Sequence, residues 1–179
     1  MLHYLASSLP LHVSPVARLL ALQIVLRATV SGGIHLPAGL VQGMGEDSVE
    51  SAWQELVDAR LIVSDPRSGV AYGGWLADPI GGMPSRNRRR RAADWALRAA
   101  RQGRVRGLGS TGRVLAVGLR ALTPYEAEPD GLASSTDMAR IFGVGAATTA
   151  YELERLMEVG VLSGWKVDSE SGETVWRLA

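Results

Sequence analysis

Cysteine is absent from the 179 residues of this chain. A disulfide framework, a zinc–thiolate site and a thiol nucleophile are therefore excluded, and we expect an intracellular, cytoplasmic protein. The longest apolar run, residues 16–26, is about half as long as a membrane span requires. The first residues, MLHYLASSLPLHV, lack the positive region and cleavage site of a secretory signal. These absences predict a soluble protein without a membrane partner.

Histidine is scarce as well, and His3, His12 and His35 lack the spacing of metal ligands. No pattern places a nucleophile beside a base. Glycines at 107, 109 and 112 satisfy G-x-G-x-x-G, but RVR precedes them instead of a hydrophobic strand, and no βαβ unit surrounds them. We therefore expect no enzyme, no cofactor and no metal, and we interpret the glycine-rich segment as a flexible hinge.

Lysine occurs once, so almost all positive charge is carried by arginine, and nine of the eighteen arginines lie in residues 86–107. Residues 1–80 hold four arginines and seven acids, a net charge of −3, whereas residues 81–123 hold eleven arginines and one acid, a net charge of +10. Residues 124–179 hold four basic and ten acidic residues, a net charge of −6. Such a basic block is typical of a contact with a polyanion, most often nucleic acid. The alternative is a solvated linker that pairs with the acidic flanks.

An internal repeat joins two segments one hundred residues apart. VQGMGEDSVESAWQELVDARLIV (41–63) aligns without gaps on IFGVGAATTAYELERLMEVGVLS (141–163), and GWLA (74–77) resembles the closing WRLA (176–179). Each copy has the pattern of a short helix, a glycine-containing turn, a longer amphipathic helix and a hairpin. The repeat predicts two copies of one supersecondary unit.

Capping residues and hydrophobic periodicity predict the individual elements. Ser14 followed by Pro15 is a typical helix start, Ser134 or Ser135 can cap another helix, and Gly160 is a natural helix end. The expected helices are 14–30, 85–102, 112–122, one ending at 142, and 146–159. The expected strand pairs are 61–63 with 70–76 and 161–167 with 173–179.

The stretch MARIFGVGAATTAYELERLMEVGVL (138–162) resembles the DNA-binding domain of GntR-type regulators, whose recognition region has a Gly-Val, a polar turn, a Thr-Thr-Val core and Leu-x-x-Leu-x-x-x-Gly-Leu. The matching residues are Met138, Ala139, Phe142, Gly143, Val144, Thr148, Leu153, Leu156, Gly160 and Val161. The first copy matches through Gly43, Val49, Leu56 and Leu61. The resemblance covers residues 45–80 and 112–179 and implies a winged helix-turn-helix in each copy.

The first copy departs from the GntR pattern, which implies arginines three and seven residues after the turn glycine. It has Glu46 and Glu50 there, with Asp47 alongside. Carboxylates are repelled by phosphates, so we expect the first copy to serve as an assembly surface for a protein partner.

The second copy has Ala146 and Ala150 at the same positions. It keeps neutral Thr148, Thr149 and Tyr151 on the recognition helix and Lys166 on the wing. We expect these four residues to contact bases or phosphates.

The arginine-rich helix, capped by Ser85, has two different faces. We expect the apolar half, made of Ala92, Ala93, Trp95, Ala96, Leu97, Ala99 and Ala100, to dock on a winged domain or on a second copy. The opposite face presents a row of guanidinium groups about 16 Å long. The expected phosphate contacts are Arg88, Arg89, Arg90, Arg91, Arg98, Arg101, Arg104 and Arg106. The five tryptophans, Trp53, Trp75, Trp95, Trp165 and Trp176, are expected mostly to pack inward or within hairpins.

The sequence thus predicts a mainly α fold with small β-hairpin wings. Two winged helix-turn-helix domains, 1–80 and 111–179, are joined by an arginine-rich helix and hinge at 81–110. We expect a homodimer, and we expect the very apolar helix 14–30 to be either buried or a surface between subunits. The protein is expected to bind double-stranded DNA, as a transcriptional regulator or a plasmid or chromosome maintenance factor at the nucleoid. The alternative is a protein-interaction scaffold of tandem winged helices, like the chromosome-condensation subunit that holds a partner chain.

Overall fold

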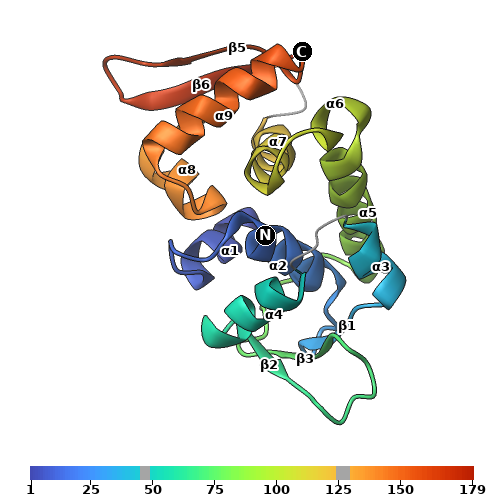
Figure 1. The fold of residues 1–179 in the computed structure, drawn as a ribbon. Helices are drawn as coiled ribbons and strands as arrows, with labels where there is room; N and C mark the ends of the chain where they lie inside the picture. The colour runs from blue at the N-terminus through green and yellow to red at the C-terminus, as the bar shows by residue number, and fades with distance from the viewer. Residues whose placement is uncertain (45–48, 124–129) are drawn as a thin grey trace.

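The computed structural model describes residues 1–44, 49–123 and 130–179. In these residues nine helices and two small antiparallel sheets of three strands form a mixed α/β fold, in rough agreement with the expected mainly helical chain (Figure 1). The first half contains α1 (Leu2–Ser8), α2 (Pro15–Arg27), β1 (Gly33–His35), α3 (Ala38–Gly43), α4 (Val49–Asp58), β2 (Ile62–Ser64) and β3 (Gly73–Leu76). The connecting segment contains α5 (Arg86–Arg101) and α6 (Gly103–Arg106). The second half contains α7 (Ser110–Leu122), β4 (Asp130–Ser134), α8 (Ser135–Phe142), α9 (Ala146–Glu158), β5 (Leu162–Val167) and β6 (Glu173–Leu178).

The two halves repeat one order of elements, helix, strand, helix, helix, strand, strand, and their sheets share one order, β1-β3-β2 and β4-β6-β5. Individual hydrogen bonds recur at an offset of one hundred residues. The amide of Leu61 donates to the carbonyl of Leu56 over 3.0 Å, and the amide of Val161 donates to that of Leu156 over 2.8 Å. The internal repeat in the sequence is therefore a repeat of local backbone structure.

Most predicted caps are present. The hydroxyl of Ser14 accepts from the amide of Ala17, with Pro15 in the first turn of α2, and the hydroxyl of Ser134 accepts from the amide of Asp137 at the start of α8. Gly143 ends α8 in the left-handed region, with a φ of 68°. Helix α5 differs, because Ser85 occupies its N-cap position without a side-chain hydrogen bond.

Each sheet contains one strand more than the predicted hairpin. Strand β1 pairs with β3 through Gly33 opposite Trp75, and β4 pairs with β6 through Asp130 opposite Arg177. The segment GGIHL has the alternation of a strand, because Ile34 and Leu36 are buried while His35 is exposed. Three residues are too few for this alternation to stand out in the sequence.

Helix α2 lies at the centre of the first half and is buried on all sides. Residues 17–26 are buried without interruption, and α1, α4, α5 and α7 pack around the helix. Of the two expectations for the apolar helix 14–30, burial and a surface between subunits, the structure confirms burial within one chain. One contiguous cluster of buried side chains continues from α2 through α5 and α7 to α9 and β6.

The two halves meet around a buried arginine. Arg18 is 3% exposed, and its guanidinium donates to the carbonyls of Pro10 and Val13 in the first half and of Arg140 and Ile141 at the end of α8. These last carbonyls lack helical partners because the helix ends there. Burial lowers the pKa of the Arg18 guanidinium from its ordinary value.

The predicted hinge after α5 is ordered. Residues 103–106 form the short helix α6, and Val105 and Leu108 are 1% and 3% exposed. These two side chains, three residues apart, anchor the glycine-rich segment in the core. The short helix and the two buried residues were not predicted, because the interpretation of the sequence weighed the glycines and not the apolar residues between them; a flexible hinge stays a prediction.

Candidate nucleic-acid interface

Helix α5 carries the arginine block along the side of the molecule, packed on α2 and α7 (Figure 1). Its inner face is made of Ala93, Ala96 and Ala100, which recur at helical spacing and are at most 2% exposed. Alanine lets α5 approach both neighbours closely. This packing fixes which arginines point outward.

Arg89 faces the core and not the solvent. It was predicted to contact phosphates, but it is not exposed to them. Its side chain is 3% exposed and donates to the carbonyl of Pro84 over 3.0 Å and to the carbonyl of Ala28, which follows α2. It lies four residues before Ala93, in line with the buried alanines. Arg89 therefore holds the start of α5 against α2.

The other arginines of the segment point to solvent. Arg104 is exposed and donates to the carbonyl of Gly160 over 2.7 Å. Seven more are exposed, and the described residues offer their guanidinium groups no hydrogen bond or ion pair: Arg86, Arg88, Arg90, Arg91, Arg98, Arg101 and Arg106. We call these seven side chains the arginine surface.

The one carboxylate on α5 is neutralised by an arginine from another helix. Asp94 accepts from Arg27 of α2 over 2.7 Å. Asp94 is also the only acidic residue in 81–123. Its pairing leaves the positive charge of α5 uncompensated by the helix itself, so the arginine surface can attract an external anion.

Two tryptophans predicted to pack inward or within a hairpin lie partly in solvent. Trp95 on α5 is 39% exposed and Trp75 on β3 is 49% exposed. By contrast, Trp53 is 4% exposed and Trp176 1% exposed, as predicted. Trp165 is half-buried, and its indole nitrogen donates to Glu154.

Helix α9 presents a mixed surface. Thr148 and Tyr151 are exposed, and the guanidinium of Arg155 lies 5.9 Å from the centre of the Tyr151 ring. Thr149, expected at the interface, is 6% exposed and donates to the carbonyl of Gly145. Glu152 is buried as well, at 6% exposed. The outward candidates on α9 are therefore Thr148 and Tyr151.

The arginine surface and these α9 residues are not brought together. Arg104 touches the C-terminal end of α9 through Gly160, whereas Thr148 lies twelve residues earlier, about 18 Å along a helix. Helix α7 packs against both α5 and α9. The sequence-predicted site thus divides into two surfaces.

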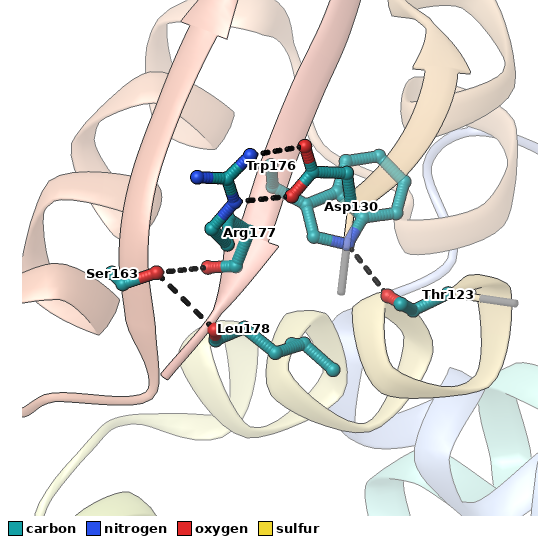
Figure 2. A network of polar contacts seen from close by, with 6 residues as sticks. All are labelled: Thr123, Asp130, Ser163, Trp176, Arg177 and Leu178. Atoms are coloured by element: carbon teal, nitrogen blue, oxygen red, sulfur yellow. Dashed lines mark hydrogen bonds and ion pairs between the residues drawn. The ribbon is translucent and has the colours of Figure 1, made fainter. Parts of the chain in front are cut away.

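A polar network fastens the second sheet to α7 (Figure 2). Arg177 donates twice to Asp130, over 2.6 and 2.7 Å, which joins β6 to β4. The indole nitrogen of Trp176 donates to the hydroxyl of Thr123 over 3.0 Å, and the hydroxyl of Ser163 donates to the carbonyl of Leu178. The hydrogen bond from Arg177 lowers the pKa of Asp130. Arg177 is therefore occupied, whereas Lys166 on the same sheet is exposed.

In the first half, the helix equivalent to α9 is acidic. Glu50 and Asp58 of α4 are exposed, and Glu55 accepts the backbone amide of Ser14 over 2.8 Å. Glu46 and Asp47, also expected on this surface, lie outside the described residues. No arginine or lysine occurs in α4.

Comparison with protein-family models, with curated proteins and with solved structures gave no match to this chain. A search of the described helices found none that is long and apolar enough to cross a membrane.

Proposed function

We propose that the chain is a DNA-binding protein built from two winged helix-turn-helix units, with the arginine surface as its main contact to phosphates. The repeated order of elements and the repeated sheet order support the winged-helix interpretation. The observation that carries the DNA-binding proposal is the exposure of seven guanidinium groups without a carboxylate partner in the described chain. Phosphate contacts dominate the affinity of proteins for nucleic acid, and arginine can hold a phosphate through two hydrogen bonds.

The test is a titration of a fluorescently labelled DNA duplex with the protein, followed by anisotropy at several salt concentrations. The variant R88Q/R91Q/R98Q removes three charges from the arginine surface, and R60Q/R67Q/R140Q removes three exposed arginines elsewhere. Each phosphate contact adds about 0.9 to the slope of log affinity against log salt, so the first variant should lower that slope by about 2.7. The second should leave the slope near its original value.

Binding without salt dependence would contradict the proposal. An equal decrease of the salt slope in the two variants would also contradict it, because the affinity would then depend only on the net charge of the protein. Within this proposal, Thr148 and Tyr151 supply contacts to bases and Lys166 a contact to phosphate, in a transcriptional regulator or a maintenance factor of plasmids or chromosomes. Self-association of the chain is a separate proposal, to be measured by light scattering.

A second candidate function is a scaffold that binds a protein through α4. The observation that favours it is the acidic outer face of this helix, where Glu50 and Asp58 are exposed and no basic residue occurs. If α4 lies away from bound DNA, E50K/D58K should leave DNA affinity within about twofold. A large gain in affinity would instead indicate that α4 lies close to phosphates.

A further inference from the structure

Trp95 is exposed because of its angular position on α5. The buried residues of the helix are Arg89, Ala93, Ala96, Ala99 and Ala100. At 100° per residue, Trp95 lies about 200° from Ala93 but only about 40° from the buried Ala99, so its indole lies at the border between the buried and the exposed face. The indole is therefore partly covered by the protein and leaves 39% of the residue's surface open to a ligand.

The neighbours of Trp95 on the outer face are arginines. Arg91 lies four residues before it and Arg98 three residues after it, the spacings at which helical side chains are adjacent. Arg88, seven residues before, continues the same row. All three arginines are exposed and lack an ion pair within the described parts of the chain. The indole therefore stands between two unpaired guanidinium groups.

This arrangement selects its ligand by chemistry. Aromatic rings set among positive charges are the means by which proteins bind unpaired nucleic acid, because each base stacks on a ring while its phosphates contact the cations. A second copy of this chain fits poorly, since a twofold contact over Trp95 would bring Arg91 and Arg98 of one copy against the same pair of arginines of the other. A fully paired duplex offers phosphates but no free base face to the indole.

A second exposed indole, that of Trp75 on β3, shares a hollow with Arg86, the first residue of α5. Trp75 borders a hollow of about 400 Å³ that is also lined by Arg86, Arg27, Thr29, His35 and Ser68. Arg27 is already paired with Asp94, and Asp65 lines the hollow as well, so its net charge is small. A nearly neutral hollow with hydroxyls and one aromatic wall suits the edge and face of a base better than a phosphate.

We propose that α5 binds single-stranded or locally unpaired nucleic acid, with one base stacked on Trp95 and another received by the hollow at Trp75. This inference rests on the proposed function, because the arginine surface supplies the phosphate contacts. The inference adds that the preferred ligand is unpaired nucleic acid, and it assigns this preference to Trp95 and Trp75.

The experiment compares three labelled ligands of one sequence by fluorescence anisotropy: a single strand, a full duplex, and a duplex with a central unpaired stretch. The unmodified protein should bind the single strand and the interrupted duplex more tightly than the full duplex. Trp95→Leu should weaken binding of the two unpaired ligands about 5-fold to 100-fold, as expected for the loss of one stacked base, and change duplex affinity less than twofold. Trp95→Tyr, which keeps an aromatic ring, should retain most of the affinity.

Trp75→Leu should act in the same direction as Trp95→Leu. Leu132→Ala, a change at an exposed apolar residue of β4, serves as the control and should have no effect on any ligand. Thermal unfolding of each variant shows whether it is folded. We expect both tryptophan variants to fold, because both indoles are partly exposed.

The outcomes separate this inference from the function on which it rests. Salt-dependent duplex binding without a preference for unpaired ligands, or equal affinities for Trp95→Leu and the unmodified protein, overturns the inference and leaves the proposed function standing. Failure to bind any of the three ligands overturns both. A change in the mass of the particle in solution caused by Trp95→Leu would show that the indole is a contact between copies, and would also overturn the inference.

Discussion

Identical residues in the run 88–91 have different structural roles. Arg89 is buried and donates to two backbone carbonyls, whereas Arg88, Arg90 and Arg91 are exposed. The sequence predicted the helix and its basic character, but not its rotation. That rotation is set by which alanines pack on α2 and α7, and alanine occurs on several sides of this helix.

This difference predicts unequal effects of the same substitution. Arg89→Ala should lower the free energy of unfolding by about 1–3 kcal/mol, because it leaves the carbonyls of Ala28 and Pro84 without a donor in a buried place. Arg90→Ala should change it by less than about 0.5 kcal/mol. Chemical denaturation of both variants measures this. Equal effects would contradict the burial of Arg89.

At the scale of elements, local sequence signals such as helix caps predicted the helix ends at which they occur. Ser14 with Pro15 marked the start of α2, and Ser134 and Gly143 marked the two ends of α8, whereas α2 ends at Arg27, before the predicted residue 30. Helix α1, helix α6 and the strands β1 and β4 were not predicted, because seven or fewer residues carry too little periodicity and their pairing depends on distant strands. The surfaces of α5 and α9 were predicted as one site because nothing local shows that α7 separates them.

Two carboxylates make the stability of the second sheet sensitive to acid. The pKa of Asp130 is lowered by the hydrogen bond from Arg177, and the pKa of Asp168 is lowered by the amides of Ser171 and Glu170 in the turn between β5 and β6. A lowered carboxylate pKa contributes stability that is present above the ordinary value of 3.8 and is lost as pH falls through the lower folded value.

The contribution of these two carboxylates to the melting temperature should therefore stay constant between about pH 7 and pH 5. Below about pH 4 the carboxylates become protonated, and that contribution should be lost. Asp130→Asn should reduce this acid sensitivity and lower the melting temperature at neutral pH. Glu158→Gln, which removes an exposed carboxylate from α9, controls for the change in net charge. If Asp130→Asn melts like the unmodified protein at every pH, the pair with Arg177 does not stabilise the sheet.

At the scale of the whole molecule, the two halves share one buried cluster and one central arginine. Arg18 reaches the carbonyl of Arg140, which lies 122 residues later in the sequence. Gly143 is required beside it, because a Cβ there would lie 2.1 Å from the Arg18 guanidinium nitrogen Nε. The apolar run 16–26 around Arg18 is a sign of burial, but nothing in the sequence indicates its partners, so this contact with residues 140 and 141 could not be predicted.

Removal of the Arg18 guanidinium should loosen the junction. We expect Arg18→Met to lower the free energy of unfolding by about 3 kcal/mol, since several buried carbonyls lose their donor. Arg140→Met, on the exposed side of α8, is the matched control and should have little effect. Calorimetry measures the loss, and a single cooperative transition in the unmodified protein would agree with one shared core.

The packing of α5 also determines how fast a protease cleaves the chain. Trypsin cleaves after arginine, and residues 86–107 offer it nine such bonds. A bond within a packed helix is cleaved only after that helix opens locally, so the survival time of this segment reports the free energy of opening α5. A bound polyanion should lengthen that time, which makes a protease a reporter of occupancy that needs no label.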